Sequence, residues 1–150
     1  MTHLLVDTSV LIKWFHSEGE GELVESRTLR RAHLSGVVDA HMLDLAAYEV
    51  GNVLVRALHW EPSEVADQLD DLNTILGPPL VMSVDWLRHA AALAHRHGLT
   101  FYDACWAATA DKLNMPLISA DRQLLASGLA ESPSNAVARL RLRNEAKGEQ

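Results

Sequence analysis

The sequence has little cysteine, few aromatic residues and no long apolar run. Its one cysteine, Cys105, excludes an internal disulfide and is typical of a protein from the reducing cytoplasm. No apolar segment approaches the roughly 18–20 residues that a membrane-spanning helix needs. The first residues also lack the basic segment, apolar block and cleavage site of a secretory signal. We therefore expect a cytoplasmic protein that does not enter a membrane.

Positive charge is also scarce in this chain. The 13 Lys and Arg residues stand against 20 Asp and Glu residues, which gives a formal net charge of -7. This balance excludes a generally basic nucleic-acid-binding protein. It does not exclude a nuclease, because cations held by clustered carboxylates offset much of the negative charge. Seven of the 13 basic residues gather in two segments, 27–31 and 139–147.

The chain is rich in apolar residues and has the length of one domain. Its 150 residues are 48% hydrophobic, which is enough to build a sizeable core. No internal repeat, low-complexity tract or long linker divides it. We predict that residues 1–150 form a single domain, with residues 143–150 as a frayed, solvated tail.

Short apolar segments alternate with amphipathic ones along the chain. The expected strands are residues 4–6, 37–42, 80–83 and 116–119, and the expected helices are residues 10–15, 23–34, 44–60, 62–76, 85–97, 100–113 and 122–125. Residues 136–142 alternate apolar with basic side chains, which predicts a further strand at an edge. Strands that alternate with helices predict an α/β fold, a three-layer α/β/α sandwich around a central parallel sheet.

The stretch from Leu4 to Ser9 is the first place where chemistry is expected. It reads as a buried strand that leads into a helix, with Asp7 at the carboxyl end of the strand and Thr8 or Ser9 as the helix cap. In open parallel sheets, ligands and catalytic groups collect at the carboxyl ends of the strands. A carboxylate in this position is costly to desolvate unless a positive charge pairs with it.

Three further carboxylates lie where they could join Asp7. Glu49 falls between core positions of its predicted helix, Asp103 lies in the first turn of another, and Asp121 follows the last predicted inner strand. Taken singly, Asp103 could serve the helix dipole and Asp121 could be an N-cap. Four carboxylates in one cleft, however, repel one another strongly unless cations are bound. Oxygen ligands favour Mg²⁺ or Mn²⁺, and such sites suit phosphoryl chemistry.

Four short motifs together resemble the PIN-domain ribonucleases. They are residues 6–9 (VDTS), 48–52 (YEVGN), 102–104 (YDA) and 119–121 (SAD). The size of the chain and the order of the motifs look most like the VapC toxins of type II toxin–antitoxin systems, from residue 4 to residue 142. The resemblance implies a parallel sheet of strand order 3-2-1-4-5. It also implies an Mg²⁺-dependent endoribonuclease that cleaves RNA phosphodiesters with a metal-activated water. Its cleft would be covered by a cognate antitoxin.

By the same resemblance, Asp7 and Asp103 are expected to be the principal ligands of Mg²⁺, for which Mn²⁺ could substitute. Glu49 would bind the metal directly or through water, and Asp121 would complete the quartet or position a second ion. Ser9 would hydrogen-bond the Asp7 carboxylate or a metal-bound water. The family also implies a homodimer, for which the apolar stripe of the predicted helix 62–76 offers a surface, although that stripe could equally be buried within one chain.

A few polar residues beside the predicted site are candidates for contact with RNA. Arg122 stands next to Asp121, and Asn52 lies three residues after Glu49, from where it could hydrogen-bond what Glu49 holds. The arginines of segment 27–31 could bind phosphates or could form a solvated helix face.

Two other functions and one other metal fit the sequence less well. An Asp-nucleophile phosphatase could use Asp7, but the second Asp expected two residues later is Ser9. A non-catalytic PIN-like module would only dock a partner. A zinc site is not favoured, because His89, His95 and His97 lack the i, i+4 spacing that places two ligands on one helix face.

Overall fold

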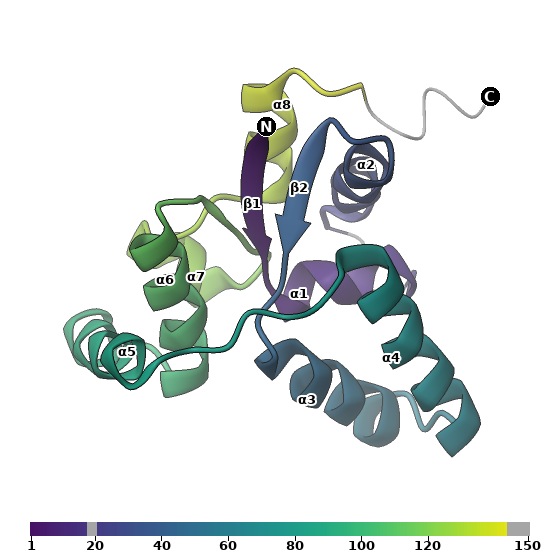
Figure 1. Cartoon of the computed structure of the whole chain (residues 1–150), viewed down its shortest axis with the longest axis horizontal. Coiled ribbons are helices and arrows are strands. Elements are labelled where there is room, and N and C mark those ends of the chain that lie inside the picture. Colours follow the sequence, from purple (N-terminus) through teal and green to yellow (C-terminus); the bar gives the residue numbers. More distant parts are fainter. Residues whose placement is uncertain (18–20, 144–150) are drawn as a thin grey trace.

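A short parallel sheet lies at the centre of the computed structural model, which describes residues 1–17 and 21–143 (Figure 1). Its strands are β1 (Thr2–Val6), β2 (Val38–His41) and β3 (Leu117–Ile118), in the order β2-β1-β3. Both neighbours pair with β1 in parallel. The predicted central parallel sheet is thereby confirmed. Of the expected frayed tail, residues 143–150, all but the first residue lie outside the described residues.

Two isolated bridges extend this sheet at its edges. Leu80 bridges Leu43 beyond β2, and Glu131 bridges Ile118 beyond β3, both in parallel. These bridges occupy the outer positions of the order 3-2-1-4-5. The strand predicted at residues 80–83 is nevertheless wrong, because only Leu80 pairs there. Two prolines without amide hydrogens precede Leu80, and the next helix begins only four residues after it.

Helices flank the sheet, with α2 to the right of the central strands and α5, α6 and α7 to the left in Figure 1. Their bounds are α1 (Thr8–Leu11), α2 (Leu23–Leu34), α3 (Leu45–Asn52), α4 (Pro62–Leu76), α5 (Val84–His97), α6 (Phe101–Leu113), α7 (Arg122–Ser127) and α8 (Pro133–Leu140). A 3₁₀ turn at Ile12–Trp14 follows α1, and a π-helical turn at Val53–Ala57 extends α3. This arrangement confirms the predicted α/β/α sandwich. Among the described residues, no helix is long and apolar enough to cross a membrane.

The edge strand predicted at residues 136–142 is wrong, because residues 136–140 belong to α8 and the helix ends at Leu140. The Ser132 hydroxyl accepts a hydrogen bond from the backbone amide three residues later, and Pro133 occupies the first turn, where its missing N–H is harmless. Pro133 and Ala136 are buried and Leu140 is half-buried, which is the i, i+3, i+7 spacing of a helix face. A run of only seven residues fits both the strand period and the helix period. The Ser132 cap and Pro133, which lie just before this run, favour the helix.

The apolar core fixes where the polar site must lie. Leu4, Leu5 and Val6 of β1 are fully buried, and the small residues of α6 let that helix pack closely. The chain leaves β1 directly into Asp7, which is itself only 4% exposed. The strand therefore carries a carboxylate to the border of the core.

The Ser132 cap gives a direct test of α8. Ser132→Ala removes the acceptor for the first turn, and this is expected to lower the free energy of unfolding by about 1 kcal/mol. For a domain of this size the melting temperature should fall by about 2–4 °C. Ser63→Ala, an exposed serine near the start of α4, is the matched control and should change stability by less than about 0.5 kcal/mol. Equal melting temperatures for Ser132→Ala and the wild type would contradict the assigned cap.

Candidate active site

Asp7 is the centre of the candidate site and is held by neutral donors. Ser9 Oγ donates to Asp7 Oδ1 at 2.6 Å, and Ser119 Oγ donates to Asp7 Oδ2 at 2.6 Å. The Val10 amide also approaches Oδ1 at 3.4 Å. Asp7 is therefore the N-cap of α1, and the sequence prediction that Thr8 or Ser9 fills this role is wrong. The cap falls on Asp7 because its backbone is still extended at the end of β1.

Each of the two serines is itself oriented by the backbone. Ser9 Oγ accepts from the Ala120 amide at 2.9 Å, and Ser119 Oγ accepts from the Asp121 amide at 3.0 Å. A hydroxyl has one proton and two acceptor lone pairs. Because backbone amides occupy the acceptor side, each hydroxyl proton is directed at Asp7. Hydrogen bonds to a charged acceptor of this kind are the stronger class.

These donors do not fully offset the burial of Asp7. Burial raises the pKa of Asp7 from 3.8 to about 6, although the hydrogen bonds from Ser119, Ser9 and Val10 act in the opposite direction. The negative charge of Glu49 adds a small further rise. A carboxylate that is ionised at neutral pH in such surroundings is stabilised by a bound cation.

Glu49 on α3 is fixed from two other elements. Its Oε1 atom accepts from Thr8 Oγ1 at 2.9 Å and from the Trp106 indole Nε1 at 2.9 Å. Thr8 begins α1 and Trp106 lies on α6, so this carboxylate links three helices. The sequence showed no signal for these contacts beyond the positions of Thr8 beside Asp7 and Trp106 one turn after Asp103.

Asp103 and Asp121 come from helix N-termini beside the same site. Asp103 lies in the first turn of α6, where its amide donates to the N-cap Thr100 Oγ1 at 3.1 Å. Burial, then the charge of Asp121, then that of Glu49 raise the pKa of Asp103. Asp121 caps α7 by accepting from the Leu124 amide at 3.0 Å. Asp103 is therefore within electrostatic reach of two other members of the predicted quartet.

The four carboxylates form a loose arrangement of oxygen donors. Within the described ranges 1–17 and 21–143, no three of them bring ligand oxygens within 4.8 Å of one another. Mg²⁺ usually retains several waters and binds protein through one or two carboxylates. An all-oxygen set with a buried Asp7 and a repelled Asp103 therefore fits Mg²⁺ or Mn²⁺, with part of the set acting through water.

The candidate RNA-contact residues lie at the border of this site. Asn52 is exposed on α3 and, together with Glu49 and Tyr102, lines a pocket of about 350 Å³. Arg122 is exposed and is the first residue of α7, directly after Asp121. Both positions are open to a ligand that enters from solvent.

The arginines of segment 27–31 include two that support the fold. Arg27 Nε donates to the Lys13 carbonyl at 3.0 Å, and Arg30 donates to the Trp14 carbonyl. These bonds tie α2 to the 3₁₀ turn after α1. The sequence left two interpretations open for these arginines, phosphate binding and a solvated helix face. Neither includes this structural role, because the carbonyl partners lie 14 and 16 residues away in the chain and only the fold brings them close.

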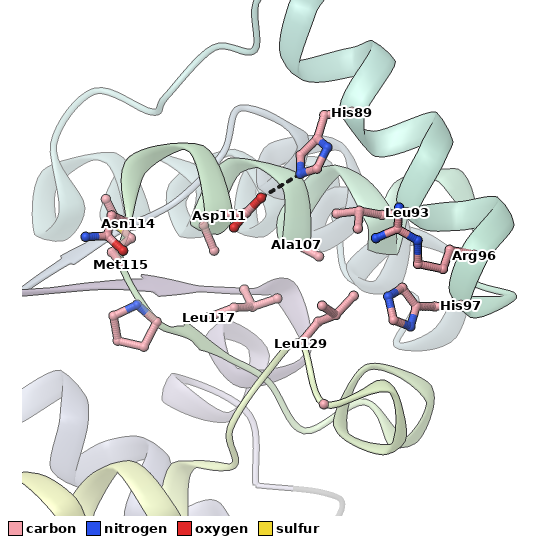
Figure 2. A pocket seen from close by; sticks show the side chains of 13 residues that line it. His89, Leu93, Arg96, His97, Ala107, Asp111, Asn114, Met115, Leu117 and Leu129 are labelled. Atoms are coloured by element: carbon pink, nitrogen blue, oxygen red, sulfur yellow. Dashed lines mark hydrogen bonds and ion pairs between the residues drawn. The ribbon is translucent and has the colours of Figure 1, made fainter.

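A separate pocket of about 550 Å³ lies between α5, α6 and the loops around β3 (Figure 2). Its lining includes His89 and Asp111, whose Nε2 and Oδ2 atoms lie 2.6 Å apart. None of the four predicted carboxylates lines it. The candidate site therefore lies at the carboxylates around Asp7, at the end of β1, and not in this pocket.

The buried charge of Asp7 predicts that Asp7→Asn stabilises the protein in the presence of a chelator. The raised pKa means that the ionised Asp7 destabilises the native state above pH 6, by up to roughly 3 kcal/mol. This cost disappears as the pH falls through 6 towards 4, because the native state takes up the proton first. Urea denaturation at pH 8 should therefore show a more stable variant, with a smaller difference at pH 4.5. Asp85→Asn, at an exposed position, is the control, and an Asp7→Asn variant less stable than wild type at pH 8 would contradict the prediction.

Comparison with known proteins gives matches that span most of the chain. The PIN domain family matches residues 4–127. The chain is 36% identical to Ribonuclease VapC3 of Pyrobaculum aerophilum over 81% of its length and 91% of the relative. It is 33% identical to Exonuclease VapC9 of the same organism over 57% of its length and 64% of the relative. The crystal structure of PAE2754 from Pyrobaculum aerophilum superposes with a TM-score of 0.64 at 26% identity, covering 93% of this chain and 97% of that one. The chain belongs to the PIN domain family, and within that family it is similar to VapC proteins.

Proposed function

We propose that this protein is a metal-dependent endoribonuclease and the toxin component of a type II toxin–antitoxin module. The observation that carries the proposal is the buried Asp7 carboxylate, held by Ser9 and Ser119 at the end of β1. Similarity to proteins named as a ribonuclease and an exonuclease supports nuclease activity. We further propose that residues 1–150 act as one domain in the cytoplasm, in keeping with a single, buried cysteine.

In this proposal Asp7 and Asp103 are the principal ligands of Mg²⁺, with Mn²⁺ as a substitute. Glu49 binds directly or through water, and Asp121 completes the quartet or positions a second ion. A metal held by these carboxylates would supply the Lewis acidity that makes a water nucleophilic towards the RNA phosphodiester, and would offset negative charge at the phosphate and the leaving oxygen. Ser9 donates a hydrogen bond to one oxygen of Asp7. Because the Ala120 amide orients the Ser9 hydroxyl, this bond keeps the carboxylate in a single orientation.

The residues bordering the site supply the proposed contacts with RNA. Arg122 is suited to hold a phosphate, since its exposed guanidinium begins α7 beside Asp121. Asn52 is suited to hydrogen-bond the RNA beside Glu49, with which it shares a pocket wall. Asn52 and Arg122 are exposed beside two different carboxylates, Glu49 and Asp121, so we propose that one RNA strand contacts both residues and is cleaved internally.

A cognate antitoxin is the proposed protein partner. The exposed aromatic residues Tyr48, Phe101 and Tyr102 border the candidate site and offer an apolar surface to a segment that covers it. Inhibition then follows from exclusion of RNA and from contact with the carboxylates.

We also propose a homodimer. The surface predicted for it from the sequence, the apolar stripe of α4, is largely buried within the chain. On α4, Leu72 is buried and Leu69 is half-buried. Apolar residues that are exposed, Val81, Val84 and Leu87, lie instead at the start of α5 and just before it. This surface is the better candidate for contact with a second copy.

The competing functions are less consistent with the site. A phosphatase that uses Asp7 as its nucleophile is expected to carry a second Asp two residues later, and this chain has Ser9 there, whose hydroxyl donates to Asp7. A non-catalytic module would have no need of a destabilising buried carboxylate at its centre.

The cleavage assay should use a circular, structured RNA, which only an endonuclease can open. The wild-type protein is expected to open the circle with Mg²⁺ or Mn²⁺ and to lose activity in excess chelator. Asp7→Asn and Asp103→Asn should reduce cleavage to background, since each removes a principal ligand. Asp85→Asn, an exposed carboxylate of α5, should cleave as the wild type does. Activity of Asp7→Asn at the wild-type rate, or cleavage of linear RNA alone, would contradict the proposal.

Asp121→Asn separates capping from metal binding. Asparagine caps a helix about as well as aspartate, so the free energy of unfolding should change by less than about 0.5 kcal/mol. Loss of the charge is expected to raise the Mg²⁺ concentration needed for half-maximal cleavage by roughly tenfold. Titration of the cleavage rate with Mg²⁺ measures this shift, and an unchanged half-maximal concentration would show that Asp121 is only a cap.

A further inference from the structure

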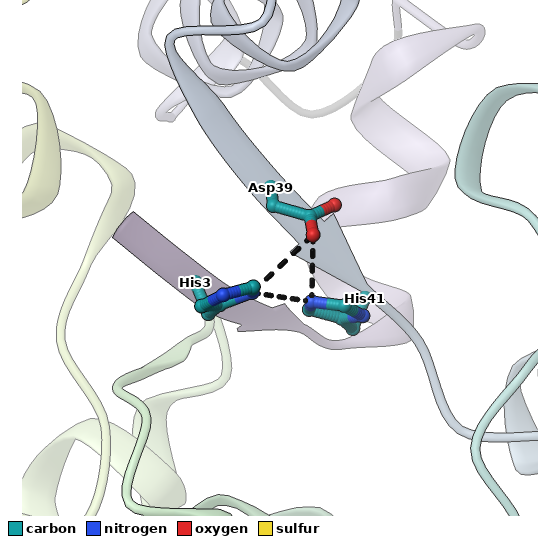
Figure 3. A group of neighbouring side chains, drawn as sticks. All are labelled: His3, Asp39 and His41. Atoms are coloured by element: carbon teal, nitrogen blue, oxygen red, sulfur yellow. Dashed lines mark hydrogen bonds and ion pairs between the residues drawn. The ribbon is translucent and has the colours of Figure 1, made fainter. Parts of the chain in front are cut away.

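A second group of metal-ligating side chains lies on β1 and β2 and includes none of the four predicted carboxylates (Figure 3). His3 belongs to β1, and Asp39 and His41 belong to β2. The parallel register pairs His3 with Asp39, and His41 lies two residues further along β2. Because paired residues share a face and side chains alternate along a strand, all three project from one face of the sheet.

Three atoms of this group lie very close together. His3 Nδ1 lies 3.0 Å from His41 Nε2 and 3.3 Å from Asp39 Oδ2, and His41 Nε2 lies 3.4 Å from Asp39 Oδ2. Among the described residues, no other group of three or more His, Cys, Asp or Glu side chains has all its ligand atoms within 4.8 Å of one another. The convergence is therefore specific to this place.

Hydrogen bonds alone do not account for the three contacts. An imidazole nitrogen carries at most one proton, and a carboxylate carries none. If both His3 and His41 direct a proton at Asp39, no proton is left between the two nitrogens, which lie only 3.0 Å apart. If one nitrogen donates to the other, one contact with Asp39 is left without a proton. A cation between the three atoms satisfies all of the contacts at once.

The spacing also matches a known coordination geometry. Zinc binds histidine nitrogen and carboxylate oxygen at about 2.0–2.1 Å, so tetrahedral ligand atoms lie about 3.3–3.4 Å apart. The observed separations of 3.0, 3.3 and 3.4 Å are close to this edge length. A zinc ion could therefore enter with little movement of the side chains.

A further histidine lies near this group but is not one of its ligands. The nearby His33 is already engaged, because its Nδ1 atom accepts from the Ala40 amide at 3.0 Å and its Nε2 atom contacts the Ile75 carbonyl at 2.6 Å. The ligand set is therefore His3, Asp39 and His41.

We propose that His3, Asp39 and His41 bind a zinc ion that joins β1 to β2. The side chain of His3 is 52% exposed, so the fourth coordination position is open to water. This site differs in chemistry from the one around Asp7, because two of its three donors are imidazole nitrogens, which suit zinc, whereas carboxylates suit Mg²⁺. A ligand that binds only the folded chain stabilises it, so zinc should raise the melting temperature.

Calorimetric titration of zinc into the full chain tests the proposal. The protein should carry no histidine tag, and excess Mg²⁺ should be present to occupy the carboxylate site. One zinc ion per chain is expected. His41→Asn and Asp39→Asn should each lower the affinity by at least roughly 100-fold, because even loss of an outer partner of a metal ligand costs about 10–100-fold. His89→Asn is the matched control, since His89 also contacts an aspartate but lacks a third ligand, and it should bind zinc as the wild type does.

X-ray absorption of the zinc-loaded wild-type protein provides a measurement that does not depend on the folding of a variant. Two imidazoles and oxygen donors in the zinc shell are expected. Absence of one-to-one zinc binding, unchanged affinity in His41→Asn, or a zinc shell of oxygen donors alone would overturn the proposal. The last result would place zinc among the carboxylates around Asp7. The test is independent of nuclease activity, so it stands whether or not RNA is cleaved.

Discussion

The pair of hydrogen bonds from Ser9 and Ser119 to Asp7 is the interaction on which the candidate site depends. The two serines are 110 residues apart in the chain and meet because β3 pairs beside β1. The Asp7 amide donates to the Ile118 carbonyl at 3.1 Å, which fixes the end of one strand against the other. The register of the sheet therefore sets the orientation of a single carboxylate.

The negative charges of the clustered carboxylates destabilise the folded protein and favour the binding of a cation. Burial raises the pKa of both Asp7 and Asp103, and negative neighbours raise them further. Neutral donors such as the Trp106 indole, which holds Glu49, orient the carboxylates without removing their charge. The clustered carboxylates destabilise the fold when no cation is bound, as functional sites often do. This arrangement is consistent with a site that a bound metal stabilises.

How much the sequence predicted depends on whether a feature is local. The position of Asp7 after an apolar strand predicted its place at the sheet edge, and the periodicity of α4 and α6 predicted those helices. Residues 136–142 were misassigned because a short alternating run also fits a helix. The group of His3, Asp39 and His41 could not be predicted, because it depends on the register between strands 38 residues apart in sequence.

The most direct test of the central claim is diffraction from crystals soaked with Mn²⁺, using its anomalous signal to locate the ion. We predict a Mn²⁺ peak in contact with Asp7 and Asp103, with the serine hydrogen bonds to Asp7 retained. Crystals of Asp7→Asn should lack this peak. A Mn²⁺ ion bound elsewhere, or no ion near Asp7 in the wild-type protein, would contradict the view that this buried carboxylate is a metal ligand.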